Sequence, residues 1–171
     1  MNLDFYKNKF EREQKRRVDL DSAMNLPILV LTLIMGLNSY VLKAYKFNST
    51  WSILDYSIVV FLILSVILIL ISSYFIFLAS NNLLKGFDYP HFDLMLKYRE
   101  IELFNKDCDD ENEKIDLEEL VKDKLVIYAD ESTLINEKRG ENLFQSRKFI
   151  IINFIITIIN IIITTSINLL K

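Results

Sequence analysis

The sequence has little of what builds turns, disulfides or metal sites: its 171 residues include three glycines, two prolines, one cysteine and one histidine. So few glycines and prolines favour long helices. A single cysteine cannot form an internal disulfide, and His91 beside Asp93 does not make a metal site. With only Cys108 and His91 available, no Ser-His-Asp or Cys-His set can be assembled, and there is no glycine-rich phosphate loop. We therefore expect a protein that is not an enzyme and that binds no cofactor or metal.

One acidic stretch, 106–119, imitates a calcium-binding loop because acidic residues alternate from Asp107 onwards. Its sixth position is Asn112, where the sharp turn of such a loop requires glycine. We therefore interpret this stretch as a solvated acidic loop.

Three long apolar segments are the main feature of the chain, at 26–45, 57–80 and 149–170. The last has no charged residue, and about 22 residues of helix would rise roughly 33 Å, enough to cross a bilayer core of roughly 30 Å. The strongly charged stretch before the first segment, with no small-residue cleavage site after it, is untypical of a cleaved signal peptide. The sequence therefore predicts an all-α integral membrane protein.

The apolar segments divide the chain into parts with different surroundings. We predict a charged helix, a transmembrane hairpin, a helical segment and a long C-terminal helix that forms a third span, over 1–25, 26–80, 81–148 and 149–171. Basic residues concentrate in the charged helix and directly before the third span. By the positive-inside rule these two regions lie in the cytoplasm and the C-terminus lies outside.

A polar stripe follows one side of the predicted third span. Its residues are spaced by four, three, four and four positions: Asn153, Thr157, Asn160, Thr164 and Asn168. At roughly 100° per residue they fall within an arc of about 80°. Asparagine is costly in hydrocarbon unless it finds a partner, so polar residues in membranes usually face other helices or water. The stripe is therefore either a packing seam inside the protein or a face for self-association or for lining a pore.

The charged stretch 2–22 has a thin apolar edge at helical spacing. We expect either a solvated helix that lies along the membrane surface or one that binds anionic lipid through its basic cluster. In the second apolar segment, small residues repeat every seven positions at Ser65, Ser72 and Ala79. Small residues let helices approach closely, and because the connection is short we expect the first two spans to form a tight hairpin.

Two helices are predicted in the cytoplasmic segment. We expect Asp88–Tyr89–Pro90 to open the first, which covers 93–105 and has an apolar stripe. The second begins at Leu117. Because no proline follows, we expect it to run into the third span, with Gly140 as its hinge.

Asn136 and Arg139 lie three residues apart in a polar part of this second helix, so they share one face. The arginine side chain has five N–H donors, and the candidate acceptors are Glu100, Glu102 and Glu137. The pair either belongs to an ordinary polar helix or holds this helix against the rest of the cytoplasmic layer.

Three runs make the sequence similar to a known family: EREQKRRVDLDSAMNLPILVLTLIMG, GFDYPHFDLMLKYREIELF and YADESTLINEKRGENLFQSRKFII. Together they resemble the small two-transmembrane effectors of bacterial anti-phage systems. These effectors accompany retrons and related reverse-transcriptase or nucleotide-signalling modules, and their layout is similar to that of SLATT-type effectors. The most telling residues are Leu20-Asp21-Ser22-Ala23 with Leu26-Pro27, Tyr89-Pro90, and Asn136 with Arg139. None is a catalytic signature, and the third apolar segment has no counterpart in a two-span layout.

The resemblance implies a location and partners. It implies a bacterial inner membrane, a homo-oligomer, and a sensor complex that is either a reverse transcriptase with its non-coding RNA or a nucleotide-signalling protein. No direct binding of nucleic acid by this chain is expected. The resemblance further implies that Asn136 and Arg139, with Tyr89 and Pro90, are packing or switching residues at the cytoplasmic face.

The function that follows is a non-enzymatic effector that oligomerises and permeabilises or depolarises the membrane when a sensor triggers it. The alternative is a membrane-anchored structural or regulatory subunit that docks a soluble partner through its cytoplasmic helices. The polar stripe is the physical basis of the first hypothesis, and the biological setting comes from the resemblance alone.

Overall fold

The computed structural model describes residues 3–45, 52–80, 87–108, 110 and 113–170. Five parts of the predicted layout lie outside these residues. They are the first two residues of the predicted charged helix, residues 46–51 of the connection between the first two predicted spans, residues 81–86 after the second, part of the acidic loop with Asn112, and the last residue of the predicted third span.

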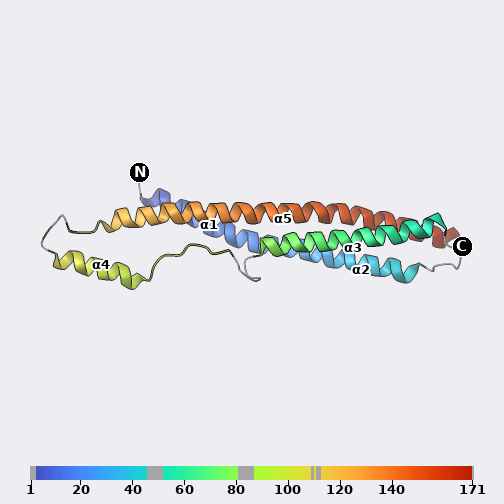
Figure 1. The fold of residues 1–171 in the computed structure, drawn as a ribbon, viewed down its shortest axis with the longest axis horizontal. Helices are drawn as coiled ribbons and strands as arrows, with labels where there is room; N and C mark the ends of the chain where they lie inside the picture. The colour runs from blue at the N-terminus through green and yellow to red at the C-terminus, as the bar shows by residue number, and fades with distance from the viewer. Residues whose placement is uncertain (1–2, 46–51, 81–86, 109, 111–112, 171) are drawn as a thin grey trace.

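The described residues form five helices and no strand, so the predicted all-α fold class is confirmed. The helices α1, α2, α3, α4 and α5 cover Leu3–Ala23, Asn25–Ala44, Ile53–Ala79, Met95–Asp107 and Leu117–Leu170. Three helical stretches are long and apolar enough to cross a membrane: Leu3–Ala44, Ile53–Ala79 and Leu117–Leu169. The molecule is a long rod in which α5 runs beside α1, α2 and α3 (Figure 1).

Helix α5 organises this rod. It has 54 residues, which at a rise of about 1.5 Å per residue makes it about 80 Å long. The prediction that one helix runs from Leu117 into the third apolar segment is confirmed. The helix continues through Gly140 without interruption, and a Cβ atom there would lie 3.9 Å from the Leu20 side chain of α1. Gly140 is therefore a place where the two helices pack closely, and the expected break is not seen.

The buried residues of α5 follow a repeat of alternating three and four positions. They are Leu125, Ala129, Ser132, Asn136, Arg139, Leu143, Ser146, Ile150, Asn153, Thr157, Asn160 and Thr164. Helix α2 has the same repeat, at Pro27, Leu31, Ile34, Asn38 and Val41. A repeat of 3.5 residues that continues over several heptads is the pattern of a left-handed coiled coil. One face of α5 is thus buried along both the charged N-terminal part and the apolar C-terminal part of this helix.

Helices α1 and α2 form one nearly continuous rod that runs parallel to α5. Only Met24 separates them, and its backbone is in the right-handed helical region, with φ −76° and ψ −22°. Lys9 pairs with Asp130 at 2.5 Å, and Arg147 donates to the Ala23 carbonyl at 3.3 Å. Helix α1 thus continues the axis of α2 and packs on α5, while its position relative to a membrane surface stays a prediction.

Helix α3 runs in the opposite direction and packs mainly on α5. Helices α2 and α3 contact α5 more extensively than they contact each other. The two predicted spans therefore pack mainly on α5, and the expected tight packing of α2 against α3 is not observed. The small residues Ser65, Ser72 and Ala79 are all buried and allow α3 to approach its neighbours closely.

Residues 87–94 do not form a helix, and α4 begins only at Met95. The expectation that Asp88–Tyr89–Pro90 opens a helix is wrong. Proline disfavours the helical conformation of the residue before it, and the Tyr89 hydroxyl donates to Asn136 of α5 at 2.6 Å. The chain is thereby held against α5 before α4 starts.

Candidate functional site

Arg139 is the centre of a buried cluster of polar groups. Its side chain is fully buried, with 0% exposure. Its Nε donates to the carbonyl of Ala79 at 2.8 Å, its Nη1 donates to the Tyr89 hydroxyl at 2.9 Å, and its Nη2 pairs with Asp21. One guanidinium therefore joins α5 to the end of α3, to the segment after it and to α1.

Burial penalises the charge of Arg139, and the hydrogen bonds to Tyr89 and Asp21 outweigh this penalty. The pKa of the guanidinium is consequently raised above its ordinary value. Arg139 is a permanent cation whose desolvation is compensated only while its partners stay in place.

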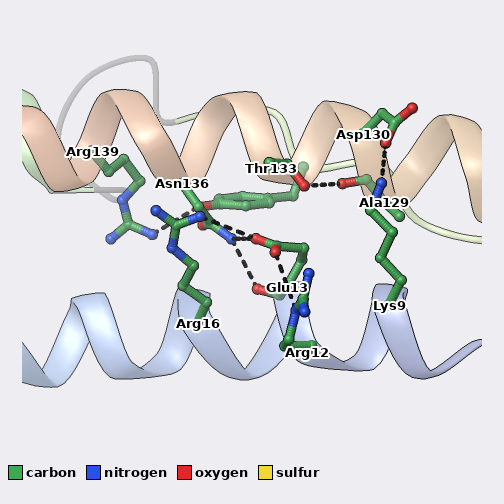
Figure 2. Close-up of polar contacts among 10 residues, drawn as sticks. Lys9, Arg12, Glu13, Arg16, Ala129, Asp130, Thr133, Asn136 and Arg139 are labelled. Carbon is green, nitrogen blue, oxygen red and sulfur yellow. Dashed lines mark hydrogen bonds and ion pairs between the residues drawn. The ribbon is translucent and has the colours of Figure 1, made fainter.

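Asn136 continues the cluster one helical turn before Arg139. Its Oδ1 accepts from the Tyr89 hydroxyl, and its Nδ2 donates to the Glu13 carbonyl at 2.9 Å and to Glu13 Oε2 at 3.2 Å (Figure 2). Tyr89 thus bridges Asn136 and Arg139 with one hydroxyl group. Pro90 follows directly and limits the conformations open to Tyr89. We call Glu13, Asp21, Tyr89, Asn136 and Arg139 the polar node.

Glu13 is a buried carboxylate, with 3% exposure, on the face of α1 that packs on α5. Arg12 and Arg16 lie on either side of it (Figure 2). Arg12 Nε is 3.8 Å from Glu13 Oε1, and Arg16 Nη1 is 3.6 Å from Glu13 Oε2. The guanidinium of Arg17 lies 4.3 Å from the centre of the Tyr89 ring. A cavity of about 560 Å³ borders the node and is lined by α1 residues and by the segment from Phe87 to Phe92. Apart from Asp21, whose side chain is 46% exposed, the node is therefore buried, and it lies next to a surface that a partner can reach.

The partners of Arg139 are not those expected from the sequence. Glu100, Glu102 and Glu137 are all exposed, and Glu102 instead pairs with Arg99 at 2.6 Å. Sequence reasoning missed Glu13 and did not connect Asp21 with Arg139. The signal that could have found Glu13 is the 3.5-residue repeat, which places it in register with Phe10, Leu20 and the buried positions of α2.

The polar stripe of the third apolar segment lies inside the chain. Asn153, Thr157, Asn160 and Thr164 are each no more than 1% exposed. Asn168, the last member, is exposed, and its Nδ2 donates to the Ala44 carbonyl at 3.1 Å. Within one chain the four buried members are a packing seam of α5 against α2 and α3.

Hydrogen bonds join the three helices across this seam. Asn38 of α2 donates to Ser65 of α3 at 2.6 Å, and Ser65 donates to Asn153 Oδ1 at 2.6 Å. Asn153 Nδ2 returns a hydrogen bond to the Ser65 carbonyl at 3.2 Å, and Thr157 donates to Asn38 Oδ1 at 3.5 Å. We call Asn38 and Ser65, together with Asn153, Thr157, Asn160 and Thr164, the polar seam.

The polar seam is not fully satisfied at its far end. Asn160 Nδ2 donates to the Ile58 carbonyl at a long 3.4 Å. Asn160 Oδ1 and Thr164 Oγ1 have no hydrogen-bond partner among the described residues. A buried polar group without a partner costs about 1–3 kcal/mol. The resting seam therefore carries polar groups that would gain hydrogen bonds from water or from another chain.

Among the described residues, no group of three or more His, Cys, Asp or Glu side chains could hold a metal ion. No family model, curated protein or solved structure matches the chain. What the site can do follows from its geometry: the α5 residues of the polar node and those of the polar seam lie on one face of a single unbroken helix.

An ion pair holds the segment after the node against α5. Lys124 pairs with Asp93, and hydrogen bonding to Lys124 is the largest cause of the lowered pKa of Asp93. Because the carboxyl pKa is lowered in the fold, the stabilisation is present above the ordinary value of 3.8 and is lost as the pH falls through the folded value.

We therefore expect α4 to loosen from α5 on acidification below pH 3.8, the ordinary pKa of the Asp93 carboxyl. The measurement is the fluorescence anisotropy of a dye attached to the single cysteine, Cys108, which follows α4. In the Asp93→Asn variant the anisotropy should already be low at neutral pH and should change less on acidification. An identical acid response in both proteins would contradict this role of Asp93.

Proposed function

We propose that this chain is a non-enzymatic membrane effector of a bacterial anti-phage system that permeabilises or depolarises the inner membrane when a sensor releases or triggers it. The observation that carries the proposal is the polar seam, buried across three apolar helices and continuous with the polar node on the same face of α5. A protein that serves only as an anchor has no need of a buried line of amides and hydroxyls through its membrane segment.

The outward faces of the apolar helices support insertion into a bilayer. Many large apolar side chains there are 50% exposed or more, among them Leu29, Leu42, Val60, Leu70, Ile151 and Ile162. In water a continuous apolar surface of this kind would drive association. In a membrane the same side chains contact lipid, and the polar groups stay inside the bundle.

We expect the N-terminus in the cytoplasm and the C-terminus outside, because Lys and Arg concentrate in α1 and at Arg147 and Lys148. Reporter fusions that are active on only one side of the membrane, placed at each end, test this expectation. A C-terminus in the cytoplasm would mean that the third apolar segment does not span the membrane.

The proposed mechanism is an exchange of hydrogen-bond partners. At rest the seam is closed by contacts within one chain, as between Asn38, Ser65 and Asn153. Interhelical hydrogen bonds in membranes contribute only about 0.6–2 kcal/mol each. Contacts within a chain can therefore be replaced at low cost by water or by the same residues of another copy. The homo-oligomer formed in this way would contain a water-filled path across the membrane.

The polar node is the proposed release point. It ties α1, the end of α3 and the Tyr89 segment to the same helix that carries the seam. The cavity beside Tyr89 gives a partner access to this segment. The resemblance favours as that partner a sensor complex, either a reverse transcriptase with its non-coding RNA or a nucleotide-signalling protein.

The test is to induce the chain without a sensor and to record the membrane potential with a voltage-sensitive dye. The signal is normalised to the amount of membrane-inserted protein. We expect depolarisation within the induction period, before growth stops. An unchanged potential at high levels of inserted protein would overturn the proposal.

A second candidate function is a membrane-anchored subunit that docks a soluble protein. The observation that favours it is the start of α4, where Leu94, Met95 and Leu96 are 79%, 81% and 66% exposed in the segment predicted to be cytoplasmic. Replacing these three residues with serine should abolish co-purification of such a partner and leave the membrane potential in the induction test as it is for the unchanged chain.

A further inference from the structure

A groove at the cytoplasmic end of the predicted membrane region has no assigned role. It has a volume of about 290 Å³ and lies between the start of α2 and the middle of α5. Its lining includes Leu26, Pro27, Ile150 and Ile155, and Arg147 is its only charged residue. The volume is close to about 300 Å³, the lower end of the range for sites that hold a small ligand.

The shape of the groove follows from the helix packing. Pro27 and Ile150 are buried and lie at positions of the 3.5-residue repeat, whereas Leu26, Ile151 and Ile155 are more than half exposed. Proline has a smaller side chain than the leucine and isoleucine at the next two buried positions of α2. The groove therefore has a packed base and walls that face outward, where the bilayer would be.

Arg147 stands at the cytoplasmic end of this groove. It precedes the other lining residues of α5, which begin one turn later at Ile150. Its Nη2 donates to the Ala23 carbonyl at 3.3 Å, which places the guanidinium beside the junction of α1 and α2. The side chain is exposed, and it has five N–H donors in total. In the described part of the chain it forms no ion pair.

We propose that this groove binds one anionic phospholipid of the inner leaflet, with an acyl chain along the groove and the phosphate on Arg147. An apolar slot that opens sideways to the bilayer fits an acyl chain. A guanidinium at the level of the headgroups fits a phosphate through paired, charge-assisted hydrogen bonds. The inference rests on the membrane insertion proposed above, and it does not depend on permeabilisation.

The test is native mass spectrometry of the purified full-length chain, titrated with phosphatidylglycerol or with phosphatidylcholine that has the same acyl chains. We expect one phosphatidylglycerol to bind at least about tenfold more tightly than phosphatidylcholine. Arg147→Gln should remove this preference, and Arg147→Lys should restore part of it. The matched control is Lys148→Gln, which removes the neighbouring charge from an exposed residue outside the groove lining and should keep the preference.

Equal binding of the two lipids, or equal effects of Arg147→Gln and Lys148→Gln, would overturn the lipid site. Glycerol phosphate that binds as tightly as the intact lipid would also overturn it, because the acyl chain would then contribute nothing. A chain recovered in the soluble fraction would overturn both this inference and the proposed function. A lipid preference in a chain that causes no depolarisation would support the site and count only against the effector.

Discussion

Replacing Arg139 with alanine is expected to destabilise the resting protein by about 1–3 kcal/mol, because it leaves the buried Ala79 carbonyl without its hydrogen-bond donor. The Tyr89 hydroxyl keeps its hydrogen bond to Asn136, and Asp21, whose side chain is 46% exposed, can be compensated by solvent. The apolar helices do not depend on this contact for insertion, so the variant should still enter the membrane. With the node opened, we expect more leakage per inserted chain than from the unchanged protein.

The measurements are thermal unfolding of the purified protein and potassium leakage per inserted chain. Lys138→Ala is the matched control, since this neighbouring basic residue of α5 is exposed. A double-mutant cycle with Asp21→Asn should be strongly non-additive, because each single change breaks the same pair. Equal stability and equal leakage of the Arg139→Ala and Lys138→Ala variants would place Arg139 outside any switching role.

Replacing Asn160 with leucine is expected to change leakage far more than it changes stability. Asn160 has one long hydrogen bond, to Ile58, and its Oδ1 is without a partner among the described residues. Leucine at this position removes an unsatisfied polar group and favours the bilayer. The resting fold should therefore keep its stability to within about 1 kcal/mol, while the opened state loses a polar group that faces water.

Leakage of potassium or of a small dye, normalised to membrane-inserted protein, should fall by about tenfold or more if opening costs an additional 1.4 kcal/mol or more. Ile159→Leu is the control, because Ile159 is the adjacent residue on the outward face of α5. If the seam only seals the helices together, the Asn153→Leu and Asn160→Leu double variant should lose stability and leak undiminished per chain. That result would contradict the pore-lining role.

The apolar half of the fold could be predicted from the sequence because its signals are local. A helix of Ile and Leu is recognised by length, and its few polar residues stand out, so the stripe from Asn153 to Thr164 was visible. The same face of α5 continues through Ser132, Asn136 and Arg139. There the repeat is hidden, because polar residues are common on every face of a helix in the charged segment.

The node itself could not be predicted, because its contacts join residues far apart in the chain. Arg139 and Asp21 are 118 positions apart, and Asn136 and Glu13 are 123 apart. Their meeting depends on α1 continuing the line of α2 beside α5, which no local pattern encodes. The start of α4 was misplaced for a related reason, since the Tyr89 hydroxyl is held by two residues of α5.

The central claim is that permeabilisation requires the polar seam to open. Ser65 and Asn153 donate and accept across it within one chain at 2.6 Å, so Ser65→Cys with Asn153→Cys, in a Cys108→Ser background, places two thiols at this contact. Potassium leakage from vesicles that contain the purified protein is measured after oxidation and again after reduction. Mass spectrometry verifies the crosslink. We predict that the crosslinked protein does not leak and that reduction restores leakage to the level of the same double variant before oxidation. Crosslinked protein that leaks as fast as the reduced form would contradict the claim.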